Sequence, residues 1–309
     1  MQSQTLEPIR GRRVWTAATA GDASAWTTVL GDESLRELEA LAGSEETDPP
    51  SLDRPPLPSC ERQLAPVREE LDQGRGFAIV EDLDESRFGG GRAVAACWAL
   101  GRLLGRPFPQ DVAGTLLYDV RDTGRSVTDG ARFSVTRAES TFHTDNAFND
   151  ELPDFVGLLC RRAALEGGRS QLINALALYN EVMASVDPET LHGAFWFDRR
   201  GQEGPGEPPI ARRRLFTRDD GELSMRYMAY YIEVGQERAG EDLTPGQGRL
   251  LEAVEEVLAR PGMRVEFDLR PGQMLFTNNH WILHNRTAFT DHPEAAERRH
   301  YVRLWLRRD

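Results

Sequence analysis

Lysine is absent from this chain of 309 residues, and all 37 of its basic residues are arginine. Without lysine the protein has no ε-amino group to form a Schiff base and no P-loop lysine to hold a nucleotide phosphate. The sequence therefore disfavours pyridoxal chemistry and phosphoryl transfer of the Walker type.

Cysteine and long apolar runs are also scarce. The three cysteines, Cys60, Cys97 and Cys160, are odd in number and far apart, which indicates neither a disulfide framework nor a paired-cysteine metal site. No stretch approaches the ~20 apolar residues of a membrane span, and the first residues, MQSQTLEPIRGRRVW, lack an apolar signal core. A net charge of -13 argues against nucleic-acid binding. We expect a cytoplasmic protein with no membrane or nucleic-acid partner.

The apolar residues that are present suffice for a core, with 39% hydrophobic content, 13 Phe and 6 Trp. Helical patterns cover residues 31–46, 59–76 and 89–105, and a buried strand is expected at 77–83. After about residue 112, some eight strand-like runs alternate with turns, interrupted by helices at 175–186 and after Thr244. Because the strands cluster instead of alternating with helices, we predict a mainly β fold with flanking helices (α+β), of the sandwich or jelly-roll type.

The domain organisation follows from the proline-rich stretch TDPPSLDRPPLP near residues 48–58. We predict that residues 1–64 form a helical and linker extension packed on the core, and that residues 65–309 form the main domain. The proline-rich stretch and the glycine- and proline-rich insert at 200–214 are candidate lids.

A possible metal site lies in the segment STFHTDNAFND, residues 140–150. In a strand, His143 and Asp145 point to the same face, so they could share a metal, form a catalytic pair or bond each other. Two histidines and one carboxylate form the facial triad that binds Fe(II). His284, on a late strand, is the candidate for the third ligand. His280 is an alternative for the same role, because a strand would place His280 and His284 on one face.

The last strand-like run, ERRHYVRLWL, places Arg299 and Arg303 on one face and apolar residues on the other. Two arginines on such a strand are costly unless each meets an anion. The anions could be acidic side chains of this acidic chain, or the carboxylates of small molecules, which arginine grips with two parallel hydrogen bonds.

Four motifs in order carry a resemblance to a known family: FHTDNAF, PDFVGLLCRRAALEGGRS, PGQMLFTNNHWILHNRTAF and RRHYVRLWL. Together they resemble the taurine dioxygenase (TauD/TfdA) family, in the clavaminate synthase-like branch of the iron(II)/2-oxoglutarate oxygenases. The likeness covers roughly residues 65–307. It implies a double-stranded β-helix core, a jelly-roll (cupin-like) variant, with flanking helices.

The resemblance also implies roles for single residues. His143, Asp145 and His284 match the Fe(II) ligands, and the presence of Asp145 argues against halogenation. Ser170, where the family usually has threonine, and Arg299, 15 residues after His284, match the groups that bind the distal carboxylate of 2-oxoglutarate. Arg303 matches a position that holds an acidic group of the prime substrate in some members.

The expected activity is that of a dioxygenase using Fe(II), 2-oxoglutarate and O2. It would oxidise, by hydroxylation, an unactivated C–H bond of a small carboxylate- or amino-acid-like metabolite and release succinate and CO2. Two alternatives use the same fold: a zinc hydrolase with the same three ligands, and a non-catalytic jelly-roll binding module. Further residues expected to line the pocket are Asn146, Phe148, Gln110, Tyr118, Arg121, Arg226 and Tyr227.

Overall fold

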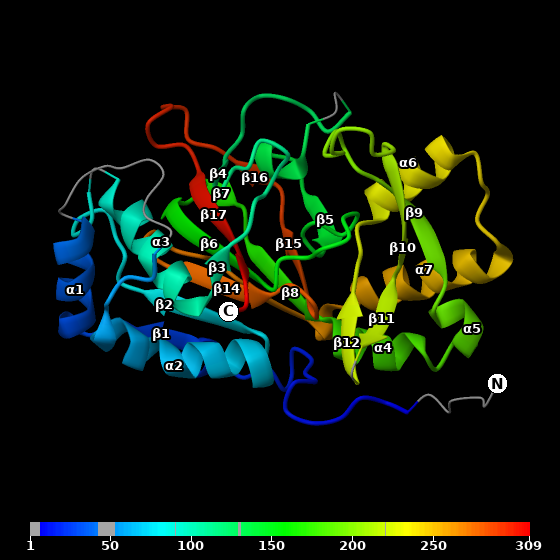
Figure 1. The fold of residues 1–309 in the computed structure, drawn as a ribbon, viewed down its shortest axis with the longest axis horizontal. Helices are drawn as coiled ribbons and strands as arrows, with labels where there is room; N and C mark the ends of the chain where they lie inside the picture. The colour runs from blue at the N-terminus through cyan, green and yellow to red at the C-terminus, as the bar shows by residue number, and fades with distance from the viewer. Residues whose placement is uncertain (1–6, 43–52, 90, 129–130, 220) are drawn as a thin grey trace.

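Two β-sheets lie between two groups of helices in the computed structural model, which describes residues 7–42, 53–89, 91–128, 131–219 and 221–309 (Figure 1). The first group packs on the main sheet and comprises α1 (Asp32–Ala42), α2 (Pro58–Gln73) and α3 (Arg92–Leu104). The second group comprises α4 (Ala175–Val182), α5 (Pro188–Leu191), α6 (Ala229–Ala239) and α7 (Pro245–Leu258). Short 3-10 turns are η1 (Ala23–Ala25), η2 (Phe133–Val135) and η3 (Pro261–Met263).

The main sheet has the strand order β1-β2-β14-β6-β17-β3, and β4 also pairs with β17. Its strands are β1 (Thr27–Val29), β2 (Phe77–Glu81), β14 (Met274–Asn278), β6 (Phe155–Arg162), β17 (His300–Arg307), β3 (Arg106–Pro107) and β4 (Leu117–Val120).

The smaller sheet has the order β13-β8-β15-β5 and carries much of the pocket described below. Its strands are β13 (Arg264–Phe267), β8 (Ser170–Asn174), β15 (Ile282–Arg286) and β5 (Ser140–His143). Three two-stranded pairs complete the structure: β9 (Ala194–Asp198) with β10 (Ile210–Arg214), β11 (Phe216–Asp219) with β12 (Glu222–Met225), and β7 (Glu166–Gly167) with β16 (Phe289–Thr290).

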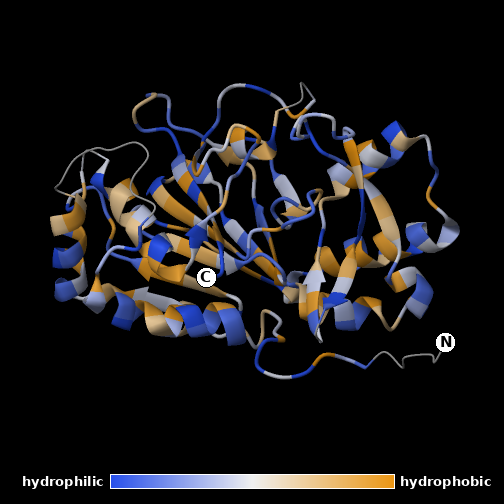
Figure 2. Cartoon of the chain, viewed as in Figure 1, coloured by the Kyte–Doolittle hydropathy of each residue, from blue (hydrophilic) through white to orange (hydrophobic). Residues whose placement is uncertain are grey.

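The inner strands of the main sheet, β2, β14, β6 and β17, are largely buried on both faces, and Figure 2 shows much of this sheet in the orange of hydrophobic residues. Alternate residues of β17 divide between two hydrophobic clusters. Leu304 and Leu306 join the cluster beneath α1–α3, whereas Tyr301 joins the cluster between the sheets. Gly101 of α3 is needed here, because a Cβ at this position would lie 2.2 Å from Leu304 Cδ2. Burial on both faces explains why these strands read as nearly continuous apolar runs.

The predicted fold is confirmed: a jelly-roll core of two sheets with flanking helices. The expected helices appear as α1–α4 and α7, and Thr244 caps α7 through a capping box with Gln247. Helix α6 and the hairpin β9–β10 were not predicted. The insert at 200–214 joins and enters that hairpin, whereas residues 43–52, which include part of the proline-rich candidate lid, lie outside the described residues.

Residues before position 65 contribute directly to the main sheet. Strand β1 pairs in parallel with β2, and the rings of Trp15 and Trp26 lie 5.4 and 5.2 Å from that of Phe77. The division into 1–64 and 65–309 stays a prediction. Over the described ranges, no helix is both long and apolar enough to cross a membrane.

Candidate active site

His143, Asp145 and His284 meet at one end of the smaller sheet. His143 is the last residue of β5 and pairs in register with His284 of β15, while Asp145 follows two residues later. One ligand atom from each residue lies within 4.8 Å of the others. The Nε2 atoms of His143 and His284 are 3.7 and 3.9 Å from Asp145 Oδ1, too far to be hydrogen-bonded but suitably placed to share an ion.

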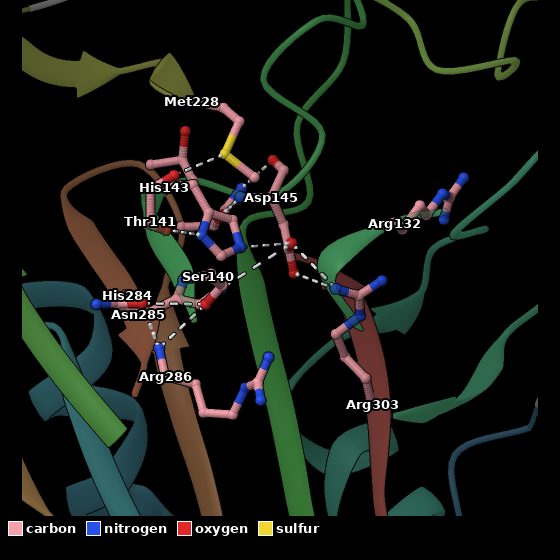
Figure 3. A network of polar contacts seen from close by, with 12 residues as sticks. Arg132, Ser140, Thr141, His143, Asp145, Met228, His284, Asn285, Arg286 and Arg303 are labelled. Carbon is pink, nitrogen blue, oxygen red and sulfur yellow. Dashed lines mark hydrogen bonds and ion pairs between the residues drawn. The ribbon is translucent and has the colours of Figure 1, made fainter. Parts of the chain in front are cut away.

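Neighbouring groups fix the orientation of two of these side chains. The His143 Nδ1 donates to the Thr141 carbonyl oxygen at 2.7 Å, which leaves Nε2 with its lone pair free for a metal. The Asp145 carboxylate accepts from Trp305 Nε1 at 2.7 Å and from Arg303 Nη1 at 3.1 Å. Figure 3 shows Asp145 reaching toward His143 on one side and Arg303 on the other.

The protonation states at neutral pH suit a metal. Burial lowers the pKa of both histidines, and for His284 the nearby His143 lowers it further, to about 3. Burial alone would raise the pKa of Asp145, but the Arg303 guanidinium and the two histidines hold it at about 2. Two neutral imidazoles and one carboxylate are the donor set of a non-haem Fe(II) centre, so the residues fit the metal that the motifs imply.

The three residues open onto a cavity of about 130 Å³ between the sheets. Ser170, the first residue of β8, lines its far end and pairs in register with Arg286 of β15. Arg299 reaches the same end and stacks on the Tyr301 ring at 3.8 Å. Its Nε is buried without a hydrogen-bond partner, so the guanidinium keeps a donor available for an anion.

Arg286 is a further candidate for binding an anion at this end of the cavity, and it was not identified from the sequence. Its Nη2 donates to the carbonyl oxygens of Thr136 and Ala138, but its Nη1 is buried without a partner. Burial and the nearby Arg299 lower the pKa of Arg286 to about 9, so its guanidinium remains charged at neutral pH. Arg286 lies two residues after His284 in the sequence, so both side chains point to the same face of the strand. This spacing could have identified Arg286 as a residue of the site.

Two glycines shape the same end of the cavity. Gly167 and Gly168 precede Arg169 and Ser170, and both have a left-handed backbone, with φ of 72° and 71°. A Cβ on Gly167 would lie 2.3 Å from the Ala288 carbonyl oxygen. The GGRS motif therefore needs glycine at this position in order to bring Ser170 to the cavity.

Arg303 pairs with Asp145, so for this arginine the acidic side chain that the sequence left open as the anion is present, although the sequence did not identify which one. Arg303 also donates from Nε to the buried amide of Gln110 at 2.8 Å. Its Nη2 is not used in these contacts, so a role toward an acidic substrate group stays a prediction.

The other expected pocket residues divide into three groups. Asn146 and Phe148 line the cavity, as predicted. Gln110 and Tyr118 lie behind its wall, where both contact Arg303. The remaining three lie elsewhere, and the prediction was wrong for them: Arg121 is mostly exposed beside Asp119, Arg226 donates to backbone carbonyls, and the buried Tyr227 hydroxyl donates to Glu255.

Comparisons with known proteins identify related oxygenases. The model of the taurine catabolism dioxygenase TauD, TfdA family matches residues 39–305. The chain is 30% identical over 313 residues to FR-33289 synthase from Streptomyces rubellomurinus, covering 97% of this chain and 90% of that protein. It is 32% identical over 175 residues to L-asparagine oxygenase from Streptomyces coelicolor, covering 54% and 46% of the two chains.

Two solved structures share the fold. An asparagine oxygenase in complex with Fe(II), 3-hydroxyasparagine and succinate has a TM-score of 0.66 at 19% identity and covers 91% of this chain and 93% of its own. The non-haem iron oxygenase OrfP with Fe and α-ketoglutaric acid has a TM-score of 0.64 at 18% identity, covering 92% and 94%.

These findings favour the oxygenase over the zinc hydrolase and the non-catalytic binding module. The protein is a 2-oxoglutarate-dependent dioxygenase that uses Fe(II), 2-oxoglutarate and O2 and acts on a small molecule. The chain belongs to the taurine catabolism dioxygenase TauD, TfdA family.

Proposed function

We propose that His143, Asp145 and His284 hold the Fe(II) of a hydroxylase whose substrate is a small organic acid. Arg299, Ser170 and Arg286 receive the far carboxylate of 2-oxoglutarate. Arg303 faces the substrate side and contributes to binding its acidic group. The observation that carries the proposal is a cavity with three converging metal-binding atoms near two arginines, each of which keeps a buried N–H group without a partner.

Bound together, Fe(II), 2-oxoglutarate and O2 supply an oxidant able to hydroxylate an unactivated C–H bond, with release of succinate and CO2. The residues of the protein bind the metal and the co-substrate and orient them. Trp305 and Arg303 hold Asp145 in its ionised form and aim one oxygen at the histidines. Leu158, Leu172 and Leu275 line the cavity between the charged groups and exclude water from the carbon chain of the co-substrate.

Relatives support a small acid as substrate. Two of them are asparagine oxygenases by name, and the OrfP structures include complexes with hydroxylated arginine. We carry over from these proteins an acidic small molecule as the substrate and hydroxylation as the outcome. A cytoplasmic location and the absence of a nucleic-acid partner stay predictions from the sequence.

The test is an anaerobic titration of the purified protein with Fe(II) and 2-oxoglutarate, followed by the metal-to-ligand charge-transfer absorption. The wild type should show the band. His143→Ala should lose it, and Arg299→Ala should need on the order of 100-fold more 2-oxoglutarate, because a buried charge-assisted pair is lost. His280→Ala, a control outside the cavity, should keep it. Tight zinc binding without any band would contradict the proposal.

A further inference from the structure

The charges that line the cavity are unbalanced. Among the described residues its lining contains four arginines, Arg132, Arg286, Arg299 and Arg303, and a single carboxylate, that of Asp145. The charges of Fe(II) and of the 2-oxoglutarate dianion cancel, so the lining keeps a surplus of positive charge. Arg286 and Arg299 lie at the co-substrate end, which leaves Arg132 and Arg303 for the prime substrate.

Arg132 and Arg303 are built into one unit on the substrate side. Gln110 is 2% exposed, and it accepts from Arg303 through its side chain and from Arg132 through its backbone carbonyl, at 2.8 and 3.2 Å. The Tyr118 ring lies 5.2 Å from the Arg303 guanidinium and 5.9 Å from that of Arg132. Figure 3 shows Arg132 beyond Arg303, on the side away from His143.

Among the described residues, the lining offers a free ammonium group no anionic partner other than Asp145. Asp145 is paired with Arg303 and belongs to the metal ligands. The nearby acidic residues are occupied outside the lining: Asp198 pairs with Arg200 and Arg238, and the Asp111 carboxylate accepts two backbone N–H groups.

Several neutral groups that could meet an ammonium group already have partners within the protein. The Asn146 amide oxygen accepts from Asn149, and its amide nitrogen donates to the Glu151 carbonyl. The rings of Tyr118 and Tyr231, which could hold a cation, already face guanidinium groups. The Ser134 hydroxyl lines the cavity and is buried without a partner, so it can bond a polar group of the substrate, but a neutral hydroxyl cannot balance a positive charge.

Resting on the function proposed above, we propose that the prime substrate is a small organic anion without a free ammonium group, whose acid group is received by Arg132 and Arg303. An unpaired buried ammonium is costly, and here it would also be repelled by two guanidiniums. The substrate therefore differs in charge from a free α-amino acid. An amine-derived substrate would carry its nitrogen in an acylated, uncharged form.

The experiment compares matched pairs of probes by anaerobic calorimetric titration of the full-length protein loaded with Fe(II) and 2-oxoglutarate. Each pair is an amino acid and its N-acetyl derivative: asparagine, aspartate, arginine and O-phosphoserine. The first three present a carboxylate and the last also a phosphate, so the panel separates the two kinds of acid group. We expect the N-acetyl member to bind at least about tenfold more tightly in the pairs that bind.

Two variants test whether Arg132 binds the acid group of the substrate. Arg132→Gln should weaken binding of the N-acetylated acids by about tenfold or more, because it removes one charged donor, and should leave the 2-oxoglutarate titration unchanged. Arg121→Gln, in the same segment but mostly exposed, is the matched control and should bind as the wild type does.

Equal or tighter binding of the free amino acids would overturn the inference. So would a panel in which nothing binds at millimolar concentration, since surplus positive charge should hold small anions, or an Arg132→Gln variant with unchanged affinities. Failure of the proposed function is distinct, because the charge-transfer band with Fe(II) and 2-oxoglutarate would then be missing before any probe is added.

Discussion

Histidine lies beside a carboxylate in two different ways in this molecule. His280 Nε2 is 2.8 Å from Asp154 Oδ1, a hydrogen-bonded pair beside the ends of the inner strands β14 and β6. His143 and His284 lie 3.7 and 3.9 Å from Asp145, beyond hydrogen-bonding distance, although all three point to one place. The first arrangement satisfies its own polar groups, whereas the second leaves two lone pairs and a carboxylate oxygen facing each other.

The surroundings explain the difference. Trp305 and Arg303 occupy Asp145, which turns the carboxylate so that one oxygen faces both histidines without bonding either. Asp154 accepts from His280 and from Arg308, so its contacts join separate parts of the chain. His300 pairs with Asp119 at 2.6 Å in the same manner as His280. Proximity of histidine and carboxylate alone does not indicate a metal site; unsatisfied, converging ligand atoms do.

The largest expected effect on turnover comes from replacing one of the histidines that face Asp145 without a hydrogen bond. His284→Ala should lower 2-oxoglutarate turnover by roughly 1000-fold or more, because the centre loses one of three protein ligands. His300→Ala removes a histidine of the paired type and should retain bound iron and turnover. The measurements are iron content after loading and succinate formation. If the two variants lost iron equally, the distinction between the two arrangements would be wrong.

Much of this comparison could be predicted from the sequence, but its decisive part could not. The spacing of His143 and Asp145 indicated a shared face, and the family resemblance selected His284 over His280. The pairing of His280 with Asp154 depends on residues 126 positions apart, which no local pattern reports. For the same reason the sequence left open whether Arg303 meets an acidic side chain or a substrate, and it did not identify Asp145 as the partner.

The fold shows the same limit. Strands β6, β14 and β17 are largely buried on both faces, and their apolar runs allowed them to be predicted as strands from the sequence. Helix α6 begins within the aromatic segment SMRYMAYYIE and packs closely on β9, where a Cβ on Gly235 would lie 2.4 Å from the Trp196 carbonyl oxygen. That helix is stabilised by tertiary packing, which local propensity does not report.

A smaller effect, on iron affinity, should follow from removing a hydrogen bond that positions the Asp145 carboxylate while all three metal ligands are kept. Trp305→Phe removes the N–H that donates to Asp145 at 2.7 Å and conserves most of the apolar ring. Loss of such an outer hydrogen bond typically weakens metal affinity by about 10- to 100-fold. Competition with a chelator, at constant 2-oxoglutarate, measures the change. Trp98→Phe, a buried tryptophan beneath the main sheet, is the control and should leave iron affinity unaltered. An unchanged affinity in Trp305→Phe would show that Arg303 alone positions Asp145.

The smallest effect on the metal centre, and one confined to stability, is expected for Asp154→Asn. Burial would raise the pKa of Asp154, but the bonds from His280 and the Arg308 backbone and side chain hold it below its ordinary value. A lowered carboxyl pKa stabilises the folded state above the unfolded pKa of about 3.9, and this contribution is lost as the pH falls through the folded value. The variant should be about 1–3 kcal/mol less stable at pH 7.

The pH dependence separates this charge effect from simple damage to packing. In urea unfolding from pH 7 downward, the stability gap between wild type and Asp154→Asn should stay constant to about pH 5 and narrow below about pH 4, where the carboxylate of the unfolded chain takes up a proton before that of the folded protein. Iron loading at pH 7 should be the same for both proteins, because Asp154 belongs to the paired arrangement. A gap that does not change with pH would mean that the ion pair adds nothing beyond its shape. Loss of iron would mean that the two arrangements are coupled through the main sheet.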